Sequence, residues 1–311
     1  MIVTLTPNPV LDRTLTVPTI EFDAVLRATS IRIDWGGKGF NVSRALKALG
    51  KESVAMAFAG GGTGHMLQHG LHALGIATDF VSVAGETRTN VVIVDQATRR
   101  HIKVNEAGPT ISPQEHDELL RRVRQRVQPG DLWVLAGSLP PGLPASFYAE
   151  VIDLVQGYGA RAFLDTSGEP LRLGCAAQPA LVKPNVAEAQ EIIGQRIDSP
   201  HDALSAAGHF LSKGIGMVAL SMGADGLVLA TTDVAVWVKP PAVPVSNPTG
   251  AGDSLLAGVV WALQQGLPLQ DVARWGAAAG TASAMREGVS VGSQTEVEAV
   301  CAQTELIDLK M

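Results

Sequence analysis

Residues 247–254, with the sequence NPTGAGDS, place two glycines and a carboxylate directly before an apolar run that predicts a helix. Glycines at 250 and 252 leave backbone N–H groups uncovered where that helix adds its unpaired donors and positive dipole end, so anionic oxygens can be held there. A carboxylate that only bound ligand would repel such an anion. Asp253 is better suited to accept a proton from a nucleophilic hydroxyl during phosphoryl transfer. A Gly-rich turn whose acid merely caps a helix is the alternative for these residues alone.

A second Gly-rich segment, residues 35–41, also opens a helix. Lys38 lies between glycines with no apolar neighbour to pack against, so it is free to meet a phosphate as a point charge. A tight turn with an exposed lysine is the alternative. The segment lacks the Gly-Lys-Ser/Thr ending of a P-loop, and no Gly-x-Gly-x-x-Gly follows a strand. Nucleotide binding by this chain would therefore be of another kind.

Three further segments carry weaker signals. Asn185 and Glu188 follow Lys183, but Asn with Glu three residues later is also a capping box. Residues 221–226, between two predicted strands, could equally form a plain hairpin turn. Ser138 ends an apolar strand, which is where open α/β sheets place their ligands. The seven histidines show no metal-ligand spacing.

The chain has 311 residues, of which 46% are hydrophobic and 17% charged, and a net charge of −6. This composition is typical of a globular protein and excludes a largely disordered chain. The basic residues are spread out except for one cluster after Ser112 to Glu115, a capping-box start, so the cluster predicts the solvated face of a helix. A nucleic-acid partner is therefore not expected. The cluster consists of Arg121, Arg122, Arg124 and Arg126.

The cysteines and the hydropathy of the chain indicate in which compartment of the cell the protein is located. Cys175 and Cys301 are far apart and show neither a disulfide framework nor zinc spacing. The N-terminus has no basic region before an apolar run, and no apolar run reaches membrane-spanning length. We therefore expect a soluble cytoplasmic protein without a membrane partner.

Short apolar runs alternate with helical patterns, which predicts an α/β fold with a largely parallel sheet. Two stretches, residues 15–32 and 87–104, break the alternation, and the second predicts a β-hairpin. Antiparallel pieces in such a frame would lie off the main sheet as a small β lid over the strand ends. We expect a single domain of residues 1–311, with lid segments at about 12–34 and 87–107. Strands are predicted at 2–6, 53–58, 132–136, 162–165, 180–183, 217–221 and 227–230, and helices at 41–49, 144–158, 185–193, 200–211 and 272–285.

Seven short motifs follow one another along essentially the whole chain. They are TPNPVLD at 6–12, GGKGFNVSR at 36–44, ETR at 86–88, AGSLP at 136–140, KPN at 183–185, SMGADG at 221–226 and TGAGD at 249–253. Each is weak alone, but their order and spacing together resemble the ribokinase-like (PfkB-type) carbohydrate kinases. Within that family the chain is similar to the branch of 1-phosphofructokinases and tagatose-6-phosphate kinases.

The resemblance implies a three-layer α/β/α fold and phosphoryl transfer from ATP, with Mg²⁺, to a sugar hydroxyl. It implies that Asp253 is the catalytic base and that Gly250, Ala251 and Gly252 form the anion hole. The sugar-phosphate side would be Asp12, Gly37, Lys38, Gly39, Asn41, Arg88, Lys103 and Ser138. The nucleotide side would be Lys183, Asn185, Ser221, Gly223, Gly226, Thr249 and Thr281, and Glu188 would organise Mg²⁺ through water. The family's lid commonly serves as a dimer interface, which implies a homodimer, and a monovalent cation near residues 247–249 stays open.

Two details of the motifs disagree about the substrate. Asn247-Pro248 is similar to the tagatose-6-phosphate branch, whereas Arg88-Thr89-Asn90-Val91 is closer to the Arg-x-Asn-Val of 1-phosphofructokinases. We expect fructose 1-phosphate to be converted to fructose 1,6-bisphosphate, with tagatose 6-phosphate or fructose 6-phosphate as alternative acceptors. A catalytically silent sugar-phosphate sensor is the alternative of another class, and the intact Asp253 argues against it because a sensor needs no base.

Overall fold

The larger of two sheets is built mainly from parallel strands. The computed structural model describes residues 1–286 and 292–309. Within them, seven neighbouring strands of this sheet run parallel, and three further strands extend one end of it in antiparallel pairing. In sheet order the strands are β14 (Glu305–Leu309), β13 (Ala235–Lys239), β12 (Leu227–Ala230), β11 (Val218–Ser221), β10 (Leu181–Val182), β9 (Arg161–Asp165), β8 (Leu132–Ala136), β1 (Ile2–Thr6), β4 (Val54–Ala59) and β5 (Ala77–Ser82). The predicted α/β class with a largely parallel sheet is confirmed.

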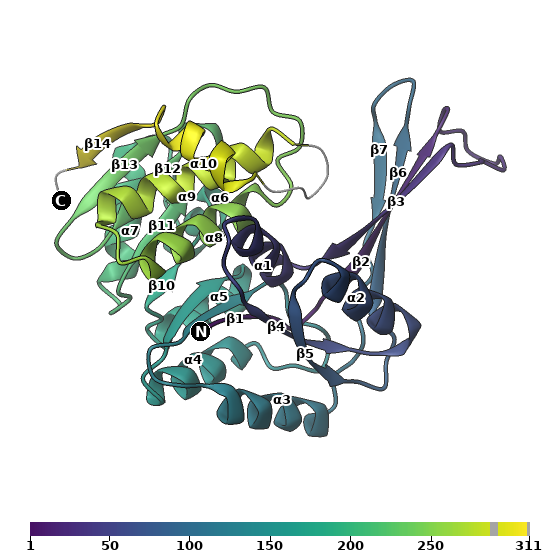
Figure 1. Cartoon of the computed structure of the whole chain (residues 1–311), viewed down its shortest axis with the longest axis horizontal. Coiled ribbons are helices and arrows are strands. Elements are labelled where there is room, and N and C mark those ends of the chain that lie inside the picture. The colour runs from purple at the N-terminus through teal and green to yellow at the C-terminus, as the bar shows by residue number, and fades with distance from the viewer. Residues whose placement is uncertain (287–291, 310–311) are drawn as a thin grey trace.

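Helices cover both faces of this sheet (Figure 1). On β8, Trp133 and Leu135 pack into the core of one face, and Leu132 and Val134 into that of the other. Burial on both faces explains why the central strands are continuous apolar runs. One face carries α3 (Pro113–Arg126), α4 (Phe147–Gly157), α5 (Gly168–Ala176), α6 (Val186–Ile193) and α7 (Pro200–Leu211), and the other carries α1 (Lys38–Ala48), α8 (Ala251–Gln264) and α9 (Leu269–Ala284), flanked by α2 (Gly61–Ala73) and α10 (Gln294–Cys301).

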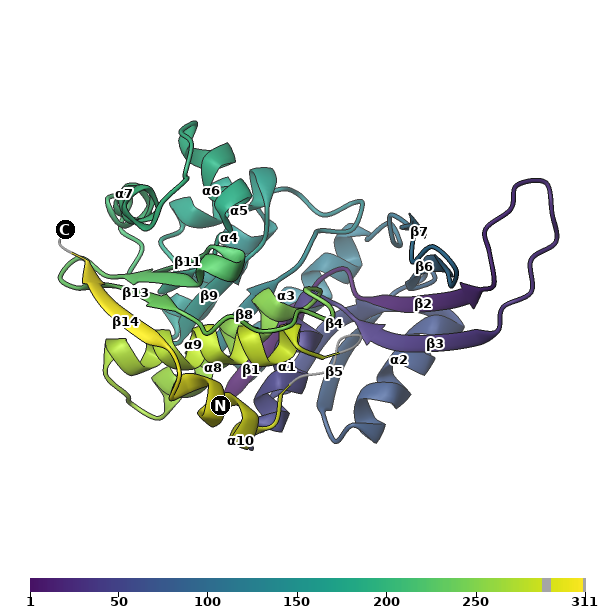
Figure 2. The same ribbon diagram turned by 90° about the horizontal axis from the view of Figure 1, so that it is seen from above.

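Four strands form a second sheet, which we call the small sheet. In order they are β3 (Ser30–Gly36), β2 (Val10–Val17), β6 (Arg88–Asp95) and β7 (His101–Val104). The small sheet projects away from the helical layers in both views (Figures 1 and 2). The β6–β7 pair is antiparallel, so the predicted hairpin is confirmed, and β2 pairs with β6 in parallel.

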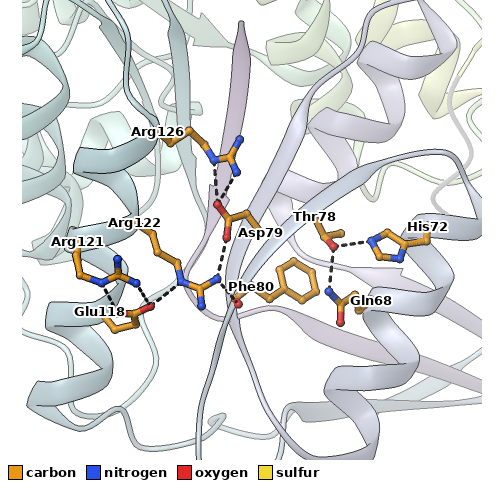
Figure 3. Close-up of polar contacts among 9 residues, drawn as sticks. All are labelled: Gln68, His72, Thr78, Asp79, Phe80, Glu118, Arg121, Arg122 and Arg126. Carbon is orange, nitrogen blue, oxygen red and sulfur yellow. Dashed lines mark hydrogen bonds and ion pairs between the residues drawn. The ribbon is translucent and has the colours of Figure 1, made fainter.

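The arginine-rich helix differs from its prediction. The capping box of Ser112 and Glu115 begins α3 as expected. However, Arg122 and Arg126 are not merely solvated, because their guanidinium groups lie 2.8 and 2.7 Å from the two carboxylate oxygens of Asp79 on β5 (Figure 3). Arg122 also donates to the Phe80 carbonyl of that edge strand. These contacts tie α3 to the end of the larger sheet.

A search of the described residues for membrane spans finds no helix with the length and apolar character needed to cross a bilayer.

Candidate active site

A cavity of about 920 Å³ opens where the parallel strands end. Its wall includes Thr6, Gly137, Thr166, Lys183 and Ser221, which end or directly follow β1, β8, β9, β10 and β11. This is the edge at which open α/β sheets bind ligands. The N-terminal ends of α1 and α8 reach the same cavity, so both Gly-rich segments meet there although they lie more than 200 residues apart.

Most of the residues predicted for the site line this cavity. They are Asp253, Gly250, Ala251, Gly252, Gly37, Lys38, Asn41, Arg88, Ser138, Lys183, Asn185, Ser221, Gly223, Gly226, Thr249 and Thr281. Asp12, Gly39, Lys103 and Glu188 do not line it.

Asp253 is buried in the first turn of α8, with 7% of its surface exposed. Its Oδ2 accepts a hydrogen bond of 2.7 Å from Asn41 Nδ2. Burial and then the negative charge of Asp165 raise the pKa of Asp253 to about 6, against the opposing influence of Lys38, Asn41 and Lys183. The carboxylate is therefore ionised at neutral pH but basic enough to take a proton.

The start of α8 presents backbone donors to the cavity. Gly250, at φ 82°, occupies the left-handed region that favours glycine, and the first bond of the helical ladder runs from Ser254 N–H to the Gly250 carbonyl. The N–H groups of Gly252 and Asp253 precede that ladder. The N–H of Ala251 instead donates to the Pro248 carbonyl at 3.2 Å, so it is engaged in the turn. The backbone donors that remain available to an anion at this turn are thus those of Gly252 and Asp253.

A buried carboxylate holds two lysines beside this turn. Asp165 is fully buried, with Lys38 Nζ 2.9 Å from Oδ1 and Lys183 Nζ 3.2 Å from Oδ2. Burial alone would raise the pKa of Asp165, but Lys183 and Lys38 outweigh it and lower that pKa. Burial would likewise lower the pKa of Lys38, but Asp165, Asp253 and Glu188 outweigh it and raise that pKa. Asp165 and Lys38 are therefore both charged.

Two glycines of the segment at 35–41 allow the backbone to approach β1 closely. Gly37, at φ 132°, is the N-cap of α1, and a Cβ there would meet Thr6 Cγ2 at 2.7 Å. A Cβ on Gly39 would meet Thr6 Oγ1 at 2.5 Å. Gly39 thus brings α1 close to the end of β1, which places Lys38 at the cavity even though Gly39 does not line it.

Glu188 takes part in a capping box, which was the structural alternative for this motif. Its Oε2 accepts from the Asn185 N–H, and Asn185 Oδ1 accepts from the Glu188 N–H, both at 2.9 Å. The other oxygen, Oε1, lies 3.9 Å from Lys38 Nζ. One oxygen therefore caps α6 while the other faces the lysine of the cavity.

The remaining predicted residues of the acceptor side belong to the small sheet. Arg88 Nη2 donates to the Asn8 carbonyl at 2.9 Å, so its guanidinium is held against the cavity wall. Asp12 Oδ1 accepts from Asn90 Nδ2, and burial raises the Asp12 pKa against the opposing influence of Asn90 and Lys103. Lys103 is exposed on β7. The family resemblance implied that Asp12, Arg88 and Lys103 share the acceptor side, but of these three only Arg88 lines the cavity in this structure.

Sequence reasoning missed several residues of the wall. Thr166 directly follows β9, where the argument applied to Ser138 at the end of a strand would have found it. Asn8 follows β1 in the same way. The segment at 239–245 carries no polar motif, so nothing in its sequence marks it as part of the cavity.

Known proteins match the chain along its length. A family model described as pfkB family carbohydrate kinase matches residues 8–296. The 1-phosphofructokinase of Rhodobacter capsulatus is 38% identical over 274 residues, 88% of this chain and 87% of that protein. The 1-phosphofructokinase of Borreliella burgdorferi is 33% identical over 287 residues, 92% of each. The phosphofructokinase-2 of Escherichia coli, solved in complex with potassium, has a TM-score of 0.92 at 30% identity, over 97% of this chain and 98% of that one. The chain therefore belongs to the pfkB family of carbohydrate kinases and has their ribokinase-like α/β fold.

Proposed function

We propose that this kinase transfers the γ-phosphoryl group of ATP to fructose 1-phosphate and so forms fructose 1,6-bisphosphate. The observation that carries the proposal is Asp253, a buried carboxylate with a pKa raised to about 6, placed among the unpaired N–H groups that begin α8. Family membership supports the reaction type. The names of the two curated relatives support the acceptor, as does the motif at residues 88–91.

The residues divide the chemistry between them. Asp253 accepts the proton of the acceptor hydroxyl, whose oxygen attacks the γ-phosphorus as the bond to the leaving ADP oxygen breaks. The N–H groups of Gly252 and Asp253 stabilise the charge on the transferred group. Lys183 assists them, because its ammonium group lies close to Gly252: a Cβ added to that glycine would be 3.5 Å from Lys183 Nζ. Lys38 and Arg88 bind the phosphate that the acceptor already carries.

Glu188 fits the Mg²⁺ that ATP would bring. The described residues contain no cluster of three or more acidic, His or Cys side chains suited to a metal. Mg²⁺ usually keeps several waters and is held by one or two carboxylates together with substrate phosphates. Glu188 Oε1 offers such a carboxylate oxygen, and the bound ion would neutralise charge on the β- and γ-phosphate oxygens.

Glu188→Gln is expected to raise the Mg²⁺ concentration for half-maximal rate by about 10-fold, with little change in melting temperature, because glutamine keeps an oxygen for the cap but loses the charge. The matched control is Glu115→Gln, which alters the equivalent capping box of α3, whose residues do not line the cavity. Equal Mg²⁺ dependence of wild type and Glu188→Gln would leave Glu188 as a helix cap only.

The proposed function is tested by ADP release from ATP over a panel of acceptors: fructose 1-phosphate, fructose 6-phosphate, tagatose 6-phosphate, fructose, ribose and adenosine. We expect fructose 1-phosphate to give the highest kcat/KM. Tagatose 6-phosphate is the second candidate, favoured by Asn247-Pro248. ADP release with none of the sugar phosphates would instead support a silent sensor. Repeating the assay with and without K⁺ tests a monovalent cation near residues 247–249, which the potassium complex of the Escherichia coli relative supports.

A homodimer is proposed through the small sheet, in a soluble cytoplasmic protein. Large apolar side chains are exposed on its strands and on the loop between β2 and β3, with Phe22 85% and Val25 84% exposed. Exposed apolar side chains gathered on one element are typical of a surface covered by a partner. Sedimentation analysis of the purified chain would distinguish a dimer from a monomer.

A further inference from the structure

Asp165 occupies a position that the reaction as described above does not use. It ends β9 with no exposed surface, and its two oxygens separately meet Lys38 and Lys183. Both ammonium groups lie against one carboxylate, although Lys38 begins α1 and Lys183 follows β10. The three side chains come from segments about 127 and 18 residues apart, so only the folded sheet brings them together.

Besides Asp165, the two lysines have different neighbours. Lys183 Nζ lies at the turn that begins α8, next to Gly252. Lys38 Nζ lies 2.9 Å from Asp165 Oδ1 and 3.9 Å from Glu188 Oε1. An ammonium on a long flexible stem has many rotamers, and a fixed carboxylate removes most of that freedom before the substrates arrive.

We propose that Asp165 is a positioning residue for this kinase, which holds Lys38 toward the acceptor phosphate and Lys183 toward the transferred phosphoryl group at the same time. The proposal rests on the proposed phosphoryl transfer. Asp165 acts through the two lysines and does not itself touch substrate. Its second effect is on the base, since Asp165, Lys38, Lys183 and Asn41 are the charged and polar groups that act on Asp253.

The test is Asp165→Asn, which keeps the shape of the side chain and removes its charge. We expect kcat to fall by about 10²-fold, as for a misplaced reactive group, and KM to rise for both the phosphosugar and ATP. We also expect the acid limb of the kcat/KM profile to move to lower pH. Loss of one negative charge leaves the lysines less neutralised, and both changes lower the pKa of Asp253. Simple loss of stability would not move the limb in that direction.

Asp79→Asn is the matched control. Asp79 is also a carboxylate between two cations on a strand of the same sheet, and its partners are Arg122 and Arg126 (Figure 3). None of these three residues lines the cavity. This control should lower the melting temperature while leaving kcat, both KM values and the acid limb at their wild-type values.

A double-mutant cycle separates the two lysines. In a Lys38→Met background, Asp165→Asn should no longer raise KM for the phosphosugar, but it should still raise KM for ATP through Lys183. If Asp165→Asn does not fold, the same comparison is made between Lys183→Met and the charge-balanced pair Asp165→Asn/Lys183→Met. Relative to Lys183→Met, the double variant should have a higher KM for the phosphosugar and the same KM for ATP.

Additive effects in this cycle, or an acid limb that stays in place in Asp165→Asn, would overturn the proposal and leave Asp165 as a structural ion pair. The wild type is assayed in parallel with the acceptor panel. An inactive wild type would contradict the kinase function itself. An active wild type, together with wild-type kcat and KM values in Asp165→Asn, would contradict only the positioning role.

Discussion

Asp253→Asn is expected to lower kcat by about 10²- to 10⁴-fold, the usual value of general-base assistance. Asparagine has nearly the shape of aspartate, and its amide oxygen can still accept from Asn41 Nδ2, so the start of α8 should keep its geometry. Removing a buried carboxylate whose pKa is raised also relieves a desolvation cost, so the fold should be retained. Single-turnover kinetics and titration with ADP would show lost chemistry with retained nucleotide binding.

The pH dependence of the wild-type rate is a second test of Asp253 as the base. Asp253 accepts a proton only as the carboxylate, and its pKa is about 6. Because this pKa is that of the free protein, kcat/KM should be constant above that pH and fall about ten-fold for each unit below it. The residual rate of Asp253→Asn should lack this limb. A variant that kept more than about half of the wild-type kcat would mean that another residue is the base.

The central strands could be predicted because burial on both faces leaves a simple pattern. β1, β8 and β12 have the predicted bounds. β8 and β12 are uninterrupted apolar runs, and β1 alternates apolar residues with two buried threonines. β5 and β14 were not predicted, because these strands carry only partial burial and therefore mix polar with apolar residues. Their pairing depends on neighbours distant in the chain, which local periodicity does not contain.

The site could be predicted where the chemistry is local. Asp253 and its two glycines form one segment, and the structure places that segment at the cavity. Asp165 could not be given a role in this way, because its meaning depends on burial and on two lysines from other segments. Glu188 remained ambiguous from sequence because a carboxylate has two oxygens. In the structure one of them forms the cap and the other faces Lys38.

Lys38→Met is expected to raise KM for the phosphosugar by about ten-fold or more while leaving KM for ATP nearly unchanged. Charge-assisted contacts to a phosphate contribute roughly 1.5–3 kcal/mol each, which corresponds to that loss. The fold should be kept, because the Lys38 side chain is 37% exposed and Asp165 would retain Lys183 as its partner. Lys47→Met is the matched control, since Lys47 is a half-exposed lysine of the same helix that pairs with Glu52.

The same argument predicts the acceptor class. Lys38 and Arg88 are both at the cavity wall, where a phosphate on the acceptor can form charge-assisted contacts with them and a neutral sugar cannot. Free fructose should therefore be a far poorer substrate than fructose 1-phosphate in the wild type. The ratio of the two kcat/KM values should shrink in Lys38→Met, because that variant has lost a contact which only the phosphate makes. Steady-state kinetics with both acceptors at saturating ATP measures this difference directly. A Lys38→Met variant that raised KM for ATP instead, or a wild type that preferred free fructose or ribose, would assign Lys38 to the nucleotide and place the protein outside the phosphosugar kinases.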